Sequence, residues 1–92
     1  MMHTFRRAGD DIHLYFSNTE NKSDRMLLTE IIQSVMEQGI EIKDKIQTSD
    51  CELFTCRGNG ICFAISFSLE GEGCSICVDD ENTLAVVEKM FA

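Results

Sequence analysis

Apolar residues follow two different periods along the chain, and the change of period predicts the secondary structure. Over residues 12–16 apolar and polar side chains alternate, which is typical of a strand with one buried face. Residues 1–11 precede it either as an N-terminal arm or as a short strand and a turn. From 24 to 38 the apolar residues recur every three or four positions. This spacing predicts an amphipathic helix whose outer face carries Glu30 and Glu37.

Alternation returns in the second half of the chain and predicts four consecutive strands. Residues 40–46 are expected to form the first, with their three isoleucines on the buried side. Residues 51–57 and 61–69 flank an Asn59-Gly60 pair, which supplies the positive φ angles that a two-residue hairpin loop requires. A fourth strand is expected over residues 74–78. We therefore expect these strands to follow one another in antiparallel succession.

The pairing of these strands follows from counting outward from the turns. A loop at residues 59 and 60 places Cys56 opposite Phe63, so the two apolar faces coincide. The fourth strand is then expected to pair back with Ile76 opposite Phe67. The same side of all three strands is apolar, and we expect the core to lie there.

A last apolar stripe, capped by Asp79 or Asp80, predicts a C-terminal helix over residues 80–91. The order is then strand, helix, four strands, helix. We expect an α+β fold with two layers, a mostly antiparallel sheet and two helices on one face. The 92 residues suffice for a single domain, 1–92, with one small core.

The other face of the predicted sheet is unusual because its central positions carry no charge, and only Arg57 at the hairpin end breaks the pattern. We expect this face either to hold the N-terminal arm or to meet a second copy of the chain, forming a homodimer. The positions that we assign to self-association are Leu53, Thr55, Cys62, Ala64, Ser66 and Cys77, and Cys51, Ser68 and Ser75 share their face.

The charge balance argues against nucleic acid as a direct ligand. Sixteen acidic residues against eight basic ones give a net charge of −8, which repels phosphate backbones and attracts basic surfaces. Residues 68–92 hold six acids against one lysine. The acids could serve only solubility and helix capping, or they could imitate the dense charge of DNA. The candidate partner-binding acids are Glu30, Glu37, Glu70, Glu72, Asp79, Asp80, Glu81 and Glu88.

Two patterns that involve cysteine could indicate catalytic or metal-binding chemistry. Cys74 and Cys77 have the spacing of a redox pair or half a zinc site, but residues three apart in a strand point to opposite faces. A cysteine hydrolase built from His13 with Cys62 or Cys77 is conceivable, although a single histidine beside a sheet is more often packed or solvated. We therefore expect a binding protein without cofactor or metal rather than an enzyme.

The cysteines and the absence of long apolar runs predict the compartment. Five cysteines, an odd number, suit a reducing environment in which thiols stay free. The N-terminal residues lack the apolar run of a signal peptide, and no stretch approaches the ~18 apolar residues of a membrane span. A cytoplasmic protein without membrane contact is expected.

In size, charge and organisation the whole chain resembles the small acidic anti-restriction proteins of phages, the Arn-like DNA mimics. The resemblance implies an acidic homodimer in the host cytoplasm that blocks a restriction enzyme of the McrBC type. Two other functions remain open from the residues. One is a small adaptor or immunity-type protein that binds a basic protein surface, and the other is a small cysteine enzyme.

Overall fold

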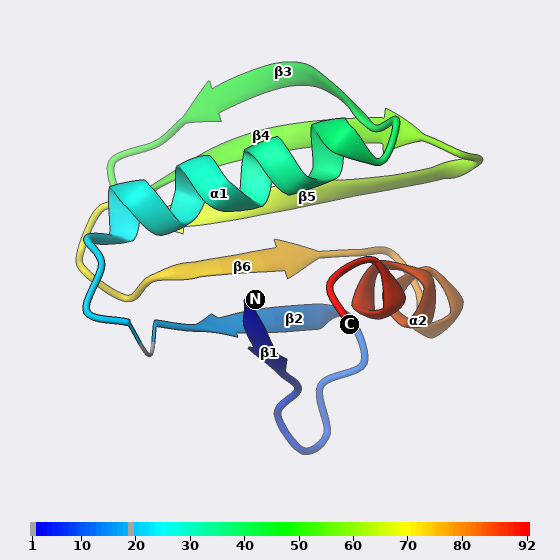
Figure 1. Cartoon of the computed structure of the whole chain (residues 1–92), viewed down its shortest axis with the longest axis horizontal. Helices are drawn as coiled ribbons and strands as arrows, with labels where there is room; N and C mark the ends of the chain where they lie inside the picture. Colours follow the sequence, from blue (N-terminus) through cyan, green and yellow to red (C-terminus); the bar gives the residue numbers. More distant parts are fainter. Residues whose placement is uncertain (1, 19) are drawn as a thin grey trace.

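A single antiparallel sheet of six strands carries both helices on one face, as the computed structural model shows for residues 2–18 and 20–92 (Figure 1). The expected α+β fold with two layers is confirmed. The strands lie in the order β1-β2-β6-β5-β4-β3. Their bounds are His3–Phe5 for β1, His13–Ser17 for β2, Glu41–Gln47 for β3, Cys51–Gly58 for β4, Ile61–Ser68 for β5 and Cys74–Cys77 for β6; the helices are α1, Asp24–Glu37, and α2, Glu81–Met90.

The β4–β5 hairpin has the register that its loop predicts, with Cys56 opposite Phe63. The loop residues Asn59 and Gly60 have φ angles of 52° and 79°, as a tight hairpin loop requires. The Asn59 side-chain amide also donates a hydrogen bond of 2.9 Å to the carbonyl of Gln38, at the end of α1. This bond ties the tip of the hairpin to the helix that packs on its strands.

The predicted register between β5 and β6 is wrong by two residues. Ile76 lies opposite Ile65, not opposite Phe67. The loop is longer than expected because the Ser68 hydroxyl accepts hydrogen bonds from two backbone amides within residues 69–73, so the chain turns earlier. A shift of two keeps every side chain on its expected face, because side chains alternate with a period of two.

Strand β3 departs from its predicted alternation. A bulge interrupts its pairing between Ile42 and Asp44, and the extra residue reverses the faces beyond it. Ile42 therefore lies on the helix side opposite Cys56, whereas Ile46 lies on the other side and is 48% exposed. The expectation that the isoleucines of this segment share one buried side is wrong.

The N-terminal segment extends the sheet rather than covering it. Strand β1 pairs with β2, and β2 pairs with β6, so residues 3–5 form an edge of the sheet. Of the two alternatives for residues 1–11, the short strand and turn is the one found over the described positions. The expectation that an arm lies across the uncharged face is wrong, because its backbone hydrogen bonds hold it in the plane of the sheet.

The core lies between the two helices and the sheet. Capping fixes where the helices begin: Ser23 accepts a hydrogen bond from the amide of Met26, and Asp80 accepts one from Thr83. Met36 continues the apolar spacing of α1, but it is 57% exposed. The fully buried side chains are Leu14, Ile31, Val35, Ile65, Ile76, Leu84 and Val87.

One buried carboxylate, which the pattern did not predict, joins three elements. Glu52 on β4 faces the helices and is only 4% exposed. Its oxygens lie 2.9 Å from Arg25 Nη1 and 3.2 Å from Lys45 Nζ. The Arg25 guanidinium also sits 4.4 Å above the ring of Phe67. These contacts connect α1, β3 and β4 at one corner of the molecule.

No helix in the described part of the chain is long and apolar enough to cross a membrane. The longest is α1, with 14 residues.

Candidate functional site

Strand β6 separates five of the predicted partner-binding acids into two groups. Glu70 and Glu72 lie in the loop before β6, and Asp79, Asp80 and Glu81 follow it at the start of α2, so they occupy opposite ends of the sheet (Figure 1). Six residues separate the two groups, which corresponds to about 20 Å of extended chain. The sequence did not predict this division, since both groups belong to one acidic stretch.

A third acid, absent from the predicted set, joins the first group. The amide of Leu69 donates a hydrogen bond of 2.9 Å to the carbonyl of Asp50, which holds the β3–β4 turn against the β5–β6 loop. Asp50 therefore lies beside Glu70 and Glu72, and we name these three the loop-end acids. The hairpin register contained the signal, because Cys51 pairs with Ser68 and the flanking turns must then be neighbours.

The second group also gains members from a distant part of the sequence. The amide of Val78 donates a hydrogen bond of 2.8 Å to the carbonyl of Ile12, which brings the turn before β2 alongside the start of α2. The helix-end acids are Asp10, Asp11, Asp79, Asp80 and Glu81. Within this group the hydrogen bonds that Asp80 accepts from Thr83 lower the pKa of the Asp80 carboxyl.

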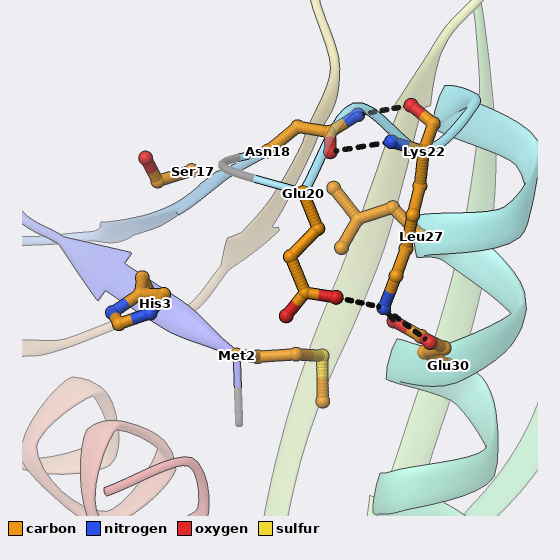
Figure 2. Close-up of a pocket in the computed structure, with 8 residues that line it drawn as sticks. All are labelled: Met2, His3, Ser17, Asn18, Glu20, Lys22, Leu27 and Glu30. Atoms are coloured by element: carbon orange, nitrogen blue, oxygen red, sulfur yellow. Dashed lines mark hydrogen bonds and ion pairs between the residues drawn. The ribbon is translucent and has the colours of Figure 1, made fainter.

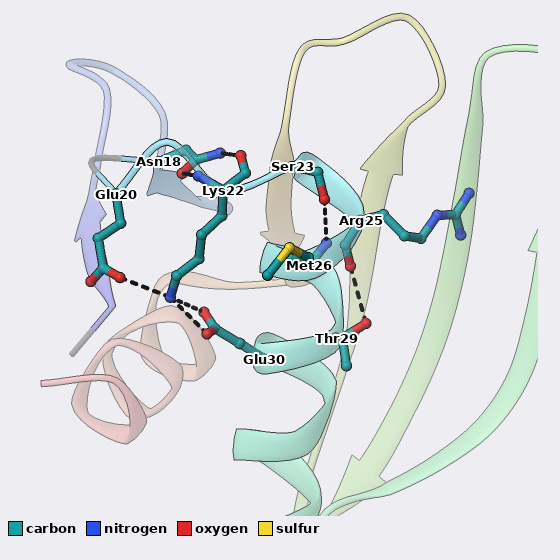
Figure 3. Close-up of polar contacts among 8 residues, drawn as sticks. All are labelled: Asn18, Glu20, Lys22, Ser23, Arg25, Met26, Thr29 and Glu30. Carbon is teal, nitrogen blue, oxygen red and sulfur yellow. Dashed lines mark hydrogen bonds and ion pairs between the residues drawn. The ribbon is translucent and has the colours of Figure 1, made fainter.

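Glu30 and Glu88 occupy different surroundings because each forms an ion pair on a helix. Glu88 lies 3.2 Å from Arg6 Nη2. Glu30 lies 2.7 Å from the Lys22 ammonium, which also contacts Glu20 at 2.9 Å, and hydrogen bonds to these two carboxylates raise the pKa of Lys22 (Figures 2 and 3). These two glutamates therefore present less free charge than the acids at the strand ends.

The same lysine lines a hollow of about 240 Å³ between β1, β2 and α1 (Figure 2). Its charged groups already satisfy one another, and the Asn18 side chain pairs with the backbone of Lys22 (Figure 3). The residues that line it are Met2, His3, Ser17, Asn18, Glu20, Lys22, Leu27 and Glu30. This arrangement explains how the segment after β2 is held. His3 and Ser17, which lie opposite each other in the β1–β2 register, also line the hollow, but no hydrogen bond joins their side chains in the described residues.

Ion pairing is distributed unevenly over the surface. Five of the eight basic residues contact a carboxylate: Arg6, Lys22, Arg25, Lys43 and Lys45. Over residues 2–18 and 20–92, ten of the sixteen acids contact no lysine, arginine or histidine side chain, and all three loop-end acids are among them. The excess negative charge is therefore concentrated on acids that no basic side chain neutralises.

The uncharged sheet face predicted from the sequence is present and is covered by neither helix. All nine predicted positions lie on the side of the sheet opposite the core, among them Ala64, Ser66 and Cys77. Tyr15 continues the face onto β2, and the Arg7 guanidinium stacks 4.1 Å from the centre of its ring. We call this surface the open face.

Cys77, one of the two cysteines expected as a nucleophile with His13, lies in surroundings that disfavour a thiolate. His13 lies opposite Cys77 in the register, and its Nδ1 is 3.0 Å from an Asp10 oxygen. However, burial raises the pKa of the Cys77 thiol, and the charges of Asp79 and Asp10 raise it further. A thiolate is therefore disfavoured at Cys77, which argues against a nucleophilic role for this cysteine.

The side chains of Cys74 and Cys77 point to opposite faces of the sheet, as their spacing in a strand predicts. Cys74 is buried on the core side, where burial raises its pKa to about 12, and Cys77 lies on the open face. Among the described residues no group of three or more histidine, cysteine or acidic side chains is placed to hold a metal ion. The comparisons with protein families, with curated proteins and with solved structures found no match.

Proposed function

We propose that this protein is an acidic inhibitor that mimics DNA and occupies the DNA-binding surface of another protein. One observation carries the proposal: carboxylates stand at both ends of the open face, whose central strands β4, β5 and β6 carry no charge there apart from Arg57, and of these acids only Asp10 forms an ion pair among the described residues. A basic groove that normally binds a DNA duplex would contact negative charge at both ends of this face. The resemblance to phage anti-restriction proteins suggests a restriction endonuclease of the McrBC type as the target.

The density of the acids supports mimicry over simple solubility. About 20 Å of duplex carries about twelve phosphate charges. The loop-end and helix-end acids together supply eight carboxylates over a comparable distance. These positions follow directly from hydrogen-bonded strands and a capped helix, so the spacing between the two groups is fixed before a partner binds. A preorganised array loses little conformational entropy on binding.

The basic residues are compatible with this function because most of them already have partners. Lys22, Lys43 and Lys45 each contact a carboxylate, and so does Arg25. They reduce the charge of α1 and of the β3 edge, and Arg57 is the basic residue that remains near the helix-end acids, in the same hollow as Asp79. We therefore place the partner-binding surface at the loop-end and helix-end acids.

Competition with duplex DNA tests the proposal. The protein is used to capture partners from a bacterial lysate, and purified McrBC-type enzyme is assayed in parallel for DNA cleavage. We expect the captured partner to bind DNA, excess duplex to displace it, and cleavage to fall as the protein is added. Salt alone does not discriminate, because any complex between exposed charges weakens when screening shortens the Debye length to ~8 Å.

Charge-neutralised variants locate the surface. Glu70→Gln/Glu72→Gln is expected to weaken inhibition at least tenfold, since it removes two carboxylates from the proposed contact. The matched control, Glu20→Gln/Glu41→Gln, removes the same charge from acids that already pair with lysines. If both variants inhibit equally, charge placement does not matter. A partner that stays bound in excess DNA would instead support an adaptor or immunity-type protein.

A further inference from the structure

The turn of the β4–β5 hairpin contains a chemically labile pair of residues. Asparagine loses its side-chain amide when the backbone nitrogen of the next residue attacks the side-chain carbonyl carbon, and a glycine at that position has no side chain to hinder the attack. The sequence contains four asparagines, Asn18, Asn21, Asn59 and Asn82, and of these only Asn59 precedes a glycine. Asn59 and Gly60 are both exposed at the tip of the hairpin. The reaction is therefore favoured at this one position.

The folded turn keeps the two reacting atoms apart. The φ angles of 52° at Asn59 and 79° at Gly60 are those of a type I′ loop, in which the first residue has a left-handed backbone. Attack closes a five-membered ring, which requires the Gly60 nitrogen to approach the side of the Asn59 Cα that carries the side chain. The backbone must leave the left-handed conformation before this approach is possible.

Contacts with the end of α1 also hold the side chain itself. Asn59 Nδ2 donates a hydrogen bond of 2.9 Å to the carbonyl of Gln38, and a Cβ atom at Gly39 would lie 3.8 Å from Asn59 Oδ1. The neighbouring Gly58 packs so closely that its own Cβ would lie 2.7 Å from the Gly39 carbonyl oxygen. The hairpin tip and the end of α1 must therefore separate before the amide can turn toward the Gly60 nitrogen.

We propose that Asn59 is a site of spontaneous deamidation and that the opening of this junction sets its rate. In the open state the Gly60 nitrogen gives its proton to solvent and bonds to the side-chain carbonyl carbon of Asn59. The side-chain nitrogen leaves as ammonia, and a succinimide ring remains. Water then opens the ring at either of its carbonyls and leaves aspartate or isoaspartate at position 59. One water molecule is consumed and one ammonia is released, so no enzyme, oxidant or reductant is required.

The products cannot close the junction again. A carboxylate has no hydrogen to donate to the Gln38 carbonyl, and its charge stands at the C-terminal end of α1, where the helix dipole is also negative. The last turn of α1, all of it within the described part of the chain, contains no basic residue that could offset this charge. Isoaspartate in addition lengthens the backbone of a two-residue loop. Deamidation therefore loosens the junction and adds one negative charge to the net charge of −8. This inference does not depend on the proposed function.

Peptide mapping by mass spectrometry, after incubation at mildly alkaline pH, tests the site. We expect slow conversion of Asn59 in the folded protein and conversion at least tenfold faster in urea, where the junction is absent. Asn82 precedes a threonine and is expected to stay intact over the same period. An intact Asn59 in urea, or equal rates in the folded and unfolded protein, would overturn the proposal.

Two glycine variants test whether the junction controls the rate. Gly58→Ala leaves the reacting pair unchanged but strains the junction, and we expect it to raise the rate in the folded protein at least fivefold. The matched control, Gly71→Ala, places its strain in a different loop and is expected to leave the rate unchanged. Equal acceleration by both variants would overturn the proposal, because global unfolding would then set the rate.

The unmodified protein tests the same point if Gly58→Ala does not fold. Local opening of a loop tip exposes little surface, so the rate is expected to stay constant as urea rises below the unfolding transition. A rate that rises steeply with urea in this range would show global control and overturn the proposal.

The variant Asn59→Asp measures the consequence of the reaction. We expect its thermal unfolding midpoint to fall below that of Asn59→Gly, which loses the same hydrogen bond without gaining a charge and accepts the positive φ. A midpoint equal to that of the unmodified protein would contradict the loosening of the junction.

Discussion

Glu52 shows how a buried charge is retained in so small a core. Burial by itself would raise the pKa of its carboxyl, but hydrogen bonds from Lys45 and Arg25 lower the pKa below the ordinary 4.5 of glutamate. A lowered folded-state pKa stabilises the protein above the unfolded-state pKa, and this contribution is lost as the pH falls through the folded-state value. Glu52 therefore contributes to stability at neutral pH and loses that contribution in acid.

The first prediction is that Glu52→Gln is less stable than the unmodified protein at pH 7 and that the difference narrows below about pH 4.5. Urea unfolding between pH 3 and pH 7 measures the denaturation midpoint of the variant and of the unmodified protein. Other carboxylates also respond to acid, so the difference between the two curves isolates this residue. Parallel curves over the whole range would show that Glu52 is not coupled to its two basic neighbours.

The cysteines differ in reactivity because their burial differs. Burial raises the pKa of Cys56 to about 11 and that of Cys74 to about 12, while Cys62 is exposed. The second prediction is that iodoacetamide at pH 8 labels Cys62 first and leaves Cys56 and Cys74 unmodified in the folded protein. Mass spectrometry of the labelled protein locates the modified thiols, and labelling in urea serves as the control.

The same labelling tests the cysteine-enzyme alternative. At mildly acidic pH we expect no cysteine to react quickly, because nothing in the surroundings of Cys77 stabilises a thiolate. Rapid modification of Cys77 under these conditions would revive that alternative and its partnership with His13.

At the scale of elements, the β4–β5 hairpin depends on a close backbone contact. A Cβ atom added at Gly58 would lie 2.7 Å from the carbonyl oxygen of Gly39 and 3.0 Å from the Cα of Ile40. The contact sits where the hairpin meets the connection between α1 and β3. It is therefore part of the same junction as the hydrogen bond from Asn59 to the end of α1.

The third prediction is that Gly58→Ala lowers the free energy of unfolding by about 1–3 kcal/mol, since backbone atoms must move to admit the methyl group. Gly71→Ala is the control: its Cβ meets nothing within 4 Å, and its φ of +82° gives only the cost of a left-handed backbone, about 1–2 kcal/mol. Denaturant unfolding measures the free energy of unfolding of both variants. If Gly58→Ala were as stable as the unmodified protein, the junction would be looser than described.

At the scale of the whole molecule, unneutralised charge opposes folding. The net charge is −8, and the loop-end acids are all without a basic partner in the part of the chain that the structure describes. Repulsion among such charges destabilises the compact state, and salt screens it. The molecule therefore maintains at some cost in stability the charge that we propose it uses for binding.

The fourth prediction is that the thermal unfolding midpoint rises between 0.01 M and 0.15 M salt, as the Debye length shortens from about 30 Å to about 8 Å. The variant Glu70→Gln/Glu72→Gln/Asp79→Asn has three fewer charges and is expected to respond less. Scanning calorimetry measures the unfolding midpoints of the variant and the unmodified protein. A low protein concentration keeps the contribution of self-association small. A midpoint that falls with salt would mean that the ion pairs outweigh the repulsion.

Interactions between near neighbours made much of this fold predictable from the sequence. The two helices follow from their periodicity and caps, and the β4–β5 register follows from the Asn59-Gly60 turn. The uncharged face follows from the same alternation, because a period of two assigns every side chain of a paired strand to one side. Each of these features depends on residues that are close in the chain or linked by one short loop.

Contacts between distant segments decided the rest. The pairing of β2 with β6 joins residues sixty or more positions apart, and it alone brings Asp10 and Asp11 beside the start of α2. Local alternation also could not show the bulge that exposes Ile46 or the partners that allow Glu52 to be buried. The sequence by itself determined how many acids there are. Tertiary pairing decided which of them stand together, because strand order and long-range register have no local signal.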